Sequence, residues 1–452
     1  MIIELQNFGP IKSFKFDTSK NIHAIFGKNN IGKSYAISAI YLILKGLSRM
    51  DNYVGKNLIY NKFDENKLNT FIRESIKISG LKSYDVKNEI VESYIFSLNM
   101  TLISGLNNSF KNSFDFSKIQ NIKTKEKFKI ILNTEIGFIV ICLNENTNEL
   151  KIDNIIFCKE FEIYNEIEDY SELEPSLAFN YYKKRKKCQF IGDVFSFLNF
   201  ELSQETASSV GSIYILPASR SGLYNALNSF GAIFAELSRN RSFITRKIEI
   251  PNIAEPISDY FLNLNTIDKA QANEHYLTHF EEIEQEILKG KITLDNETKK
   301  YYYVPTDTDM RLDLSFTSSM ISEIAPIIAH LKYIIPLESD KPSILFIEEP
   351  EAHLHPEIQV LLIEYFVKLS KGNVKIVMTS HSNYIFNKLS NLLIANKIDK
   401  DKLSVLLMKM TPEGSVIEDG AMQMDEYGIE DNNFVDVAEQ LYEERMSLLE
   451  KL

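Results

Sequence analysis

Short apolar segments near the N-terminus are followed by a segment with helical spacing. Residues 2–8 and 13–16 carry alternating patterns typical of strands, and the apolar run over 22–26 is typical of a buried strand. Apolar residues over 33–47 recur at three- and four-residue intervals, which predicts a helix. The first part of the chain therefore predicts strands that lead through a loop into a helix.

The last third of the chain predicts a second α/β region. Apolar runs over 343–347, 374–378 and 403–408 predict strands, and helical spacing over 356–369 and 383–395 predicts two helices between them. Alternating strands and helices indicate a parallel sheet with helices on its faces. The predicted sheet is therefore divided between the two ends of the chain, with insertions between them.

The middle of the chain is more polar and less regular. Asparagine, lysine and serine interrupt aromatic segments over 51–204, whereas 222–290 is expected to be largely helical. Turn-like segments between apolar runs predict two hairpins. The strand pairs of these hairpins are 127–142 with 150–157 and 291–294 with 301–304.

Length and composition indicate an ordinary globular protein. The chain has 452 residues, enough for two or three lobes, with 44% hydrophobic and 25% charged residues. The formal net charge of −12 argues against a protein coated in nucleic acid, although a local basic groove stays open. A cytoplasmic location without membrane contact is expected, because no apolar run approaches a span of about 20 residues and no leader pattern is visible at the start.

The cysteines and one histidine pair offer little chemistry. Cys142, Cys158 and Cys188 are odd in number and form no C-x-x-C pair, so free thiols in a reducing compartment are expected. His353 and His355 are spaced like metal ligands but have no third ligand nearby in the sequence. No structural metal is therefore expected.

The most specific motif is Gly27-Lys28-Asn29-Asn30-Ile31-Gly32-Lys33-Ser34, a complete G-x-x-x-x-G-K-S. Its glycines let backbone amides turn inward as an anion nest, and the following helix presents its positive N-terminus to phosphate. Lys33 is expected to reach the β- and γ-phosphates, and the Ser34 hydroxyl to ligate Mg²⁺. The alternative is a glycine turn beside an ordinary helix, but a strand before and a helix after are the context that ATP binding requires.

A pair of carboxylates follows the predicted strand at 343–347. Glu348 and Glu349 fall at the C-terminal end of that strand, the edge where parallel sheets bind ligands. Glu348 is expected to hold Mg²⁺, directly or through water, and Glu349 to polarise the attacking water as general base. Without the phosphate loop, the same residues would be interpreted as a helix cap.

His381 follows the predicted strand at 374–378. A histidine at this exit can hydrogen-bond a γ-phosphate or the attacking water, although a lone histidine is as often structural. The sequence therefore assigns His381 to the same sheet edge and leaves both hypotheses open.

These three elements, in this order and this far apart, resemble an ABC-type ATPase of the SMC, RecF and OLD branch, an AAA-family ATPase without a Toprim domain. The stretch from Glu348 to Pro356 is similar to OLD-type ATPases. The resemblance implies an α/β fold, with an ABC-type P-loop ATPase head, a split nucleotide-binding sheet, an antiparallel β subdomain and an inserted helical lobe. It also implies that 353–356 belong to the D-loop region, that His381 is the switch histidine and that 214–220 is a Q-loop equivalent.

The resemblance also points to a signature segment at 314–323. In the family, serine and glycine of this segment contact the γ-phosphate bound by the opposite subunit. Ser318 and Ser319 fit this pattern, but Met320 replaces the usual glycine and cannot bring its backbone as close to phosphate. Without the family, the segment is an N-capped helix start.

Four parts of the chain follow from these assignments. They are an ATPase core lobe at 1–50 and 330–420, an insertion with β-hairpin elements at 51–210, a helical and signature lobe at 211–329 and an acidic helical tail at 421–452. OLD proteins carry a Toprim nuclease beyond the switch histidine, whereas 71 residues follow His381 here. The layout is similar to ATPase components of bacterial anti-phage systems such as Septu and PARIS, which partner separate nucleases.

The sequence therefore predicts an ATP hydrolase that uses Mg²⁺ and acts as a conformational switch. Two subunits, in a homodimer or a higher oligomer, would sandwich two ATP molecules, with Lys33 and Ser34 of one facing Ser318 and Ser319 of the other. A separate effector nuclease is the expected partner. One alternative is a RecF-like DNA-maintenance ATPase, and another is an ATP-binding scaffold with little turnover, which Met320 keeps open.

DNA stays a further possible partner because of one basic run. Five consecutive cations at 183–187 follow Tyr181 and Tyr182, and this combination can grip a phosphate backbone. A charge run is also the ordinary pattern of a solvated face. Both interpretations stay open.

Overall fold

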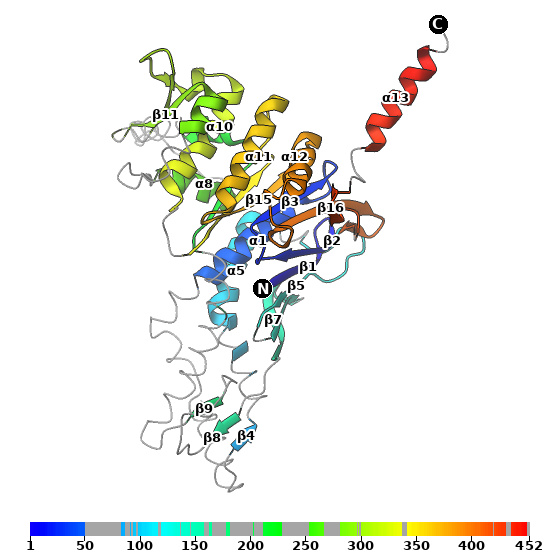
Figure 1. The fold of residues 1–452 in the computed structure, drawn as a ribbon. Helices are drawn as coiled ribbons and strands as arrows, with labels where there is room; N and C mark the ends of the chain where they lie inside the picture. Colours follow the sequence, from blue (N-terminus) through cyan, green and yellow to red (C-terminus); the bar gives the residue numbers. More distant parts are fainter. Residues whose placement is uncertain are drawn as a thin grey trace, which may run out of the picture.

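One eleven-stranded sheet runs through the protein, with helices on both of its faces (Figure 1). The fold is that of a computed structural model. It describes residues 1–49, 83–85, 91, 94–95, 98–115, 119–135, 137–144, 146–157, 162–164, 178–180, 202, 211–227, 253–265, 281–295, 297, 300–336, 341–418, 420–430 and 435–449.

Strands from the two ends of the chain, joined by one from its middle, form the parallel half of this sheet. Their order is β10 (Ile213–Leu216), β14 (Ser343–Glu348), β15 (Val374–Ser380), β3 (Ile22–Gly27) and β16 (Leu403–Thr411). All four neighbouring pairs are parallel, and the N-terminal strand β3 lies between two strands of the last third. The predicted split sheet is confirmed.

The other half of the sheet is mostly antiparallel and continues from β16 without a break. Only β17 and β2 pair in parallel there. The predicted antiparallel β region is thus hydrogen-bonded to the nucleotide-binding strands rather than separate from them. Its strands, in sheet order, are β17 (Gly414–Ile417), β2 (Ile11–Asp17), β1 (Ile2–Phe8), β5 (Lys129–Asn133), β6 (Gly137–Asn144) and β7 (Glu149–Phe157).

The expected single strand over 127–142 is wrong, because a tight turn divides it into β5 and β6. The Thr134 amide donates to the Gly137 carbonyl at 2.9 Å, and Gly137 adopts a φ of 146°. A Cβ on Gly137 would lie 2.0 Å from the carbonyl oxygen of Ile156. A glycine inside an apolar run is the sequence signal for such a break.

The parallel strands bury side chains on both faces, which explains their continuous apolar sequences. In β14, Ile344 and Phe346 join one apolar cluster, while Leu345 and Ile347 join the other. The first cluster contains α1 (Lys33–Ser48). The alternation of successive side chains thus assigns each residue of a buried strand to a particular core.

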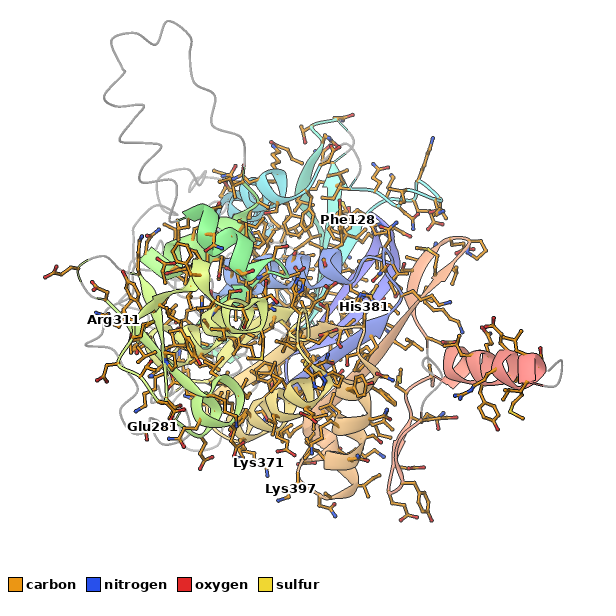
Figure 2. All side chains as sticks on the ribbon, turned by 90° about the horizontal axis from the view of Figure 1, so that it is seen from above. Phe128, Glu281, Arg311, Lys371, His381 and Lys397 are labelled. Carbon is orange, nitrogen blue, oxygen red and sulfur yellow. The ribbon has the colours of Figure 1, made fainter. Side chains whose placement is uncertain are left out.

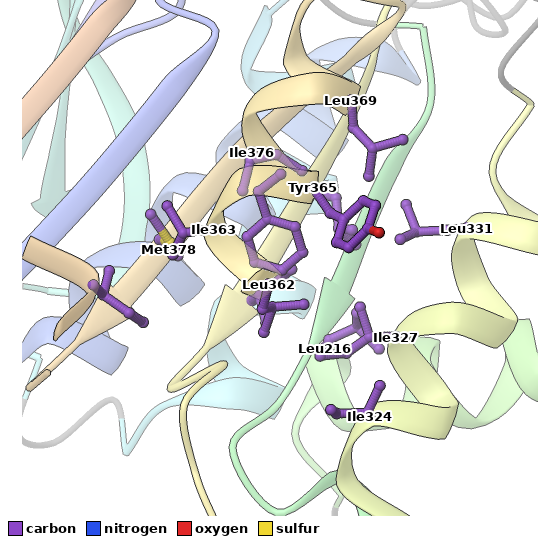
Figure 3. Packing of buried hydrophobic residues seen from close by; sticks show 14 of the residues in the cluster. Leu216, Ile324, Ile327, Leu331, Leu362, Ile363, Tyr365, Leu369, Ile376 and Met378 are labelled. Atoms are coloured by element: carbon purple, nitrogen blue, oxygen red, sulfur yellow. The ribbon is translucent and has the colours of Figure 1, made fainter. Parts of the chain in front are cut away.

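The second cluster lies on the opposite face, beneath three helices. These are α10 (Ser319–Ala329), α11 (Pro356–Ser370) and α12 (Asn383–Ile394). Figure 3 shows side chains of α10 and α11 gathered around Leu216 of β10. The helices that follow the carboxylate and histidine strands are thereby fixed against the sheet.

The segment between β10 and β14 adds helices and a small second sheet. It contains α8 (Glu255–Asn265), a π-helix η6 (Glu284–Leu288) and a π-helix η8 (His330–Ile334). The hairpin expected at 291–294 and 301–304 is confirmed as β11 (Gly290–Leu294) and β12 (Tyr301–Pro305). Within the described residues of 222–290, helical structure is present at 222–227, in α8 and at 281–288.

The expected helical tail over 421–452 needs a correction. A short hairpin of β18 (Met424–Asp425) and β19 (Gly428–Ile429) comes first, and helix α13 spans Val435–Leu449. Gly428 adopts a φ of 114°, which supports the hairpin turn. Figures 1 and 2 show α13 standing clear of the rest of the molecule.

Some expectations fall on residues outside the described ranges. Cys142 is a buried free thiol, whereas Cys158 and Cys188 are not among the described residues. The basic run at 183–187 and its neighbouring tyrosines also lie outside them. No helix in the described part of the chain has the length and apolar content to cross a membrane.

Replacing Phe346 with alanine is expected to lower the free energy of unfolding by about 3–5 kcal/mol, because a buried ring leaves a cavity. Phe346 is fully buried, with its ring 6.4 Å from that of Phe16 and 5.8 Å from that of Tyr41. The matched control is Phe316→Ala, whose side chain is 84% exposed and whose loss should cost under about 0.5 kcal/mol. Urea unfolding followed by circular dichroism measures both, and equal effects would contradict this account of the core.

Candidate active site

The phosphate loop joins β3 to α1 through backbone that only glycine adopts readily. Gly27 has a φ of 142°, and a Cβ there would lie 2.6 Å from the Met408 carbonyl oxygen. Gly32 caps α1 with a φ of 95°, and a Cβ there would lie 2.8 Å from Pro10. Ile31 is buried and anchors the loop, whereas residues 28–30 are exposed. The amides of the first helical turn, which lack intrahelical acceptors, are therefore available to an anion.

Lys33 curves back over the loop that precedes it. Its ammonium donates to the carbonyl oxygens of Gly27 and Lys28, both at 2.9 Å, and lies 2.8 Å from Nε2 of His381. Burial lowers the pKa of Lys33 to about 8, against the opposing field of Glu349. The cation is thereby held across the loop, where a phosphate would enter.

Ser34 and Glu348 meet although they come from opposite ends of the chain. The Ser34 hydroxyl lies close enough to the carboxylate of Glu348, the last residue of β14, to favour its charged form. Burial raises the pKa of Glu348, and the Ser34 hydroxyl opposes that shift. This oxygen pair is the donor set that Mg²⁺ prefers when phosphates and waters complete its coordination.

Glu349 leaves the line of the strand and turns toward the loop. Its backbone is left-handed, with a φ of 45°, and its amide donates to the Thr379 carbonyl at 3.1 Å. The carboxylate lies 3.6 Å from Nε2 of His381 and is 41% exposed. An accessible carboxylate beside a histidine is suited to accept a proton from water.

His381 links the loop to the carboxylate strand. Since the Lys33 ammonium can only donate, Nε2 of His381 accepts and the ring proton lies on Nδ1. Burial, followed by the Lys33 charge, lowers the pKa of His381. Figure 2 places this histidine near the middle of the molecule. The residue is therefore neutral and in contact with both other parts of the site.

Sequence reasoning gave no specific role to two supporting residues. Glu351 accepts hydrogen bonds from the Ser380 hydroxyl at 2.8 Å and from the His381 amide at 2.6 Å, which fixes the histidine turn. Arg220 is fully buried and donates to the carbonyl oxygens of Glu348 and Glu349. In the sequence, Glu351 was only a third glutamate after the pair, and Arg220 was only the last residue of the segment that the resemblance gave as a Q-loop equivalent.

Strand register explains why these groups converge. Ser380 of β15 pairs with Phe26 of β3, and Glu348 of β14 pairs with Thr379 of β15. The C-terminal ends of β14, β15 and β3 therefore reach one sheet edge, beside the phosphate loop. Ligands of open α/β sheets bind at such an edge.

The signature residues lie apart from this edge. Ser318 caps α10 by accepting a hydrogen bond from the Ile321 amide at 3.4 Å, and both it and Ser319 are exposed. Met320 is half-buried and packs against the second cluster. The methionine thus anchors the helix start, and the two serines remain accessible to another molecule.

His353 and His355 are spaced like metal ligands in the sequence. His353 and His355 are both exposed, and His355 precedes the first turn of α11. Among the described residues, no group of three or more His, Cys, Asp or Glu side chains is arranged to hold a metal ion.

Comparisons with curated proteins and with solved structures give relatives of low sequence identity. Endonuclease GajA from Bacillus cereus (strain HuB5-5) is 25% identical over 403 residues, which cover 80% of this chain and 52% of GajA. The chain thus spans about half the length of that relative. Solved structures give weaker likenesses. An Smc head bound to the C-winged helix domain of ScpA has a TM-score of 0.40 at 12% identity, covering 92% of this chain and 96% of that one. The SMC head domain from Thermotoga maritima has a TM-score of 0.36 at 10% identity, covering 92% and 97%.

The family match decides which family the chain belongs to. The family described as AAA ATPase domain matches residues 1–386, which include the phosphate loop, both strand-end carboxylates and His381. The chain therefore belongs to the AAA ATPase domain family and is an ATP-hydrolysing P-loop enzyme.

Proposed function

We propose that the protein is an ABC-type ATPase that binds ATP and Mg²⁺ between two subunits and hydrolyses ATP to drive a conformational switch. Its role would be that of a cytoplasmic sensor or regulatory subunit in anti-phage defence, acting with a separate nuclease. The observation that carries the proposal is the convergence of Lys33, the Ser34–Glu348 pair and the Glu349–His381 pair at one sheet edge. The similarity to about half the length of an endonuclease supports the association with a nuclease.

The phosphate loop provides the binding step. Its amides and Lys33 would hold the β- and γ-phosphates, whose oxygens would replace the Gly27 and Lys28 carbonyls as acceptors for the ammonium. Ser34 and Glu348 would hold Mg²⁺, because their side-chain oxygens lie near each other. The ion would neutralise charge that develops on the phosphates.

Glu349 is proposed as the general base. Its left-handed backbone turns the carboxylate toward the loop, where it would accept a proton from the attacking water. Once Lys33 binds phosphate, Nε2 of His381 loses its present donor and becomes available to the γ-phosphate or the water. The histidine would thereby report on nucleotide occupancy.

The exposed start of α10 supports a dimer in which each site is completed by its partner. Ser318 and Ser319 lie at a helix N-terminus, where hydroxyls and amides favour an anion. Met320 supports a second candidate, an ATP-binding scaffold with little turnover. Because its side chain packs on the core at a position where the family has glycine, it limits the approach of the helix start to phosphate.

Glu349→Gln is expected to lower kcat by about 10²- to 10⁴-fold, because the amide cannot accept the proton. Isothermal titration with ATP and Mg²⁺ should show retained binding, whereas Lys33→Ala should abolish it. Glu357→Gln is the matched control, since that carboxylate is 85% exposed on α11 and should leave turnover unchanged.

Unchanged turnover in Glu349→Gln would show that this residue is not the base. Wild-type protein that binds ATP without turnover would favour the scaffold, and hydrolysis that requires added double-stranded DNA would favour a RecF-like ATPase.

The affinity for ATP with Mg²⁺ is expected to fall as pH rises, since Lys33, with a pKa of about 8, loses its charge. The terminal phosphate ionises near pH 6, so its charge is constant over this range. Between pH 7 and pH 9 the fall should be roughly tenfold. Lys33→Arg stays charged throughout and should give a flat profile in titration calorimetry. A flat profile in the wild type would contradict the assignment.

ATP should dimerise the Glu349→Gln variant, because nucleotide that is not hydrolysed holds both subunits. Light scattering should report a doubled mass with ATP and Mg²⁺, and Ser319→Arg should prevent it by placing a bulky side chain at the exposed helix start. Ser19→Arg, in the turn between β2 and β3, is the control and should still dimerise. A monomer in every case would exclude the dimeric site.

A further inference from the structure

Arg220 contacts both the turn at Glu348 and Glu349, called the carboxylate turn below, and helix α10. Its Nη1 donates to the Glu348 carbonyl at 2.7 Å, and its Nη2 donates to the Glu349 carbonyl at 3.2 Å. Its Nε donates to the backbone carbonyl of Glu323, on α10, at 3.3 Å. One guanidinium thus joins the carboxylate turn to the signature helix.

The contact with the carboxylate turn bears on the direction of Glu349. Successive carbonyls of a regular strand point to opposite sides, so one guanidinium cannot hold both. Here the left-handed backbone of Glu349 brings the carbonyls of Glu348 and Glu349 to the same donor. Residues in this region of φ and ψ persist only when their surroundings hold them. Arg220 is the group that holds this turn from inside the protein.

Arg220 contacts α10 through an ion pair as well as through a hydrogen bond to the backbone. The Glu323 carboxylate forms an ion pair with Nη2 of Arg220 at 3.4 Å and accepts a hydrogen bond from the Ser221 hydroxyl. Glu323 lies four residues after Ser319, one helical turn from the exposed helix start. A shift of α10 would therefore move the carboxylate that pairs with Arg220.

We infer that Arg220 is a positioning residue that couples the start of α10 to the direction of the Glu349 carboxylate. The inference rests on the proposed function, in which Glu349 acts on the nucleotide of its own subunit and α10 contacts that of the partner. Through Arg220, the nucleotide at one site sets the catalytic geometry at the other. The arginine itself touches neither nucleotide.

A second buried ion pair provides a control for a purely structural role of Arg220. Burying a charge is costly unless it is fully paired, and apolar side chains often replace buried ion pairs without loss of stability. The same segment contains such a pair, in which Lys332 donates to Glu284 at 2.9 Å and to the Ile292 carbonyl at 3.2 Å. That pair joins η8, η6 and β11 and makes no contact with the carboxylate turn, so it serves as the control.

Kinetics of Arg220→Lys and Glu323→Gln in the full chain test the inference. Lysine keeps the charge but cannot reach three carbonyls with a planar fork. We expect kcat to fall at least tenfold in each variant. The affinity for ATP with Mg²⁺, measured by titration calorimetry, should change less than threefold. The double variant should lose little more kcat than either single variant, because each substitution breaks the same interaction between Arg220 and Glu323.

Glu284→Gln weakens the control pair and should change kcat less than twofold. It should lower the melting temperature about as much as Arg220→Lys and Glu323→Gln do. Equal kcat in Arg220→Lys, Glu323→Gln and wild type, or effects of the two substitutions that multiply, would overturn the inference. If Arg220→Lys fails to fold, Glu323→Gln alone decides, since it keeps the shape and the hydroxyl contact. These results are distinguishable from failure of the proposed function, in which the wild type itself shows no turnover or Glu349→Gln retains it.

Discussion

The parallel pairing of β3 with β15 on one side and β16 on the other is the constraint on which the rest of the structure depends. It brings the phosphate loop, the carboxylates and the histidine to one edge, although the chain supplies them from its two ends. The register also decides which side chains face each helical layer, because a slip by one residue would exchange the two cores. The chemistry of the site is thus a consequence of strand order.

Much of this core was accessible from the sequence, for physical reasons. Strands buried on both faces must be apolar throughout, so β14 and β15 are visible as uninterrupted runs. The phosphate loop is visible because its backbone requires glycine at 27 and 32, and few other residues satisfy that geometry. The signals were local, and local signals are what a sequence displays.

The remaining features depend on contacts between distant segments, which no local pattern contains. Arg220 follows a strand, as many exposed loop arginines do. The carbonyls that satisfy its buried guanidinium belong to Glu348 and Glu349, which lie 128 and 129 residues further along the chain. The contact of Ser34 with Glu348 likewise joins residues from opposite ends of the chain. Glu351 had no signal beyond its charge, since its partners lie on the next strand. The prediction of one long strand over 127–142 was wrong for a different reason. The apolar pattern continues through the turn at Gly137 and so hides it.

The position of β3 also has a consequence for synthesis on the ribosome. Ile22 of this strand pairs with Ile376, so β3 is translated long before its two neighbouring strands exist. At about 5–20 residues per second, the interval is on the order of tens of seconds. During this interval β3 is an apolar strand outside the ribosome whose two edges have no partner strand. Unpaired strand edges favour aggregation. Nascent chains of this protein are therefore expected to depend on chaperones that shield the N-terminal strands until the last third emerges.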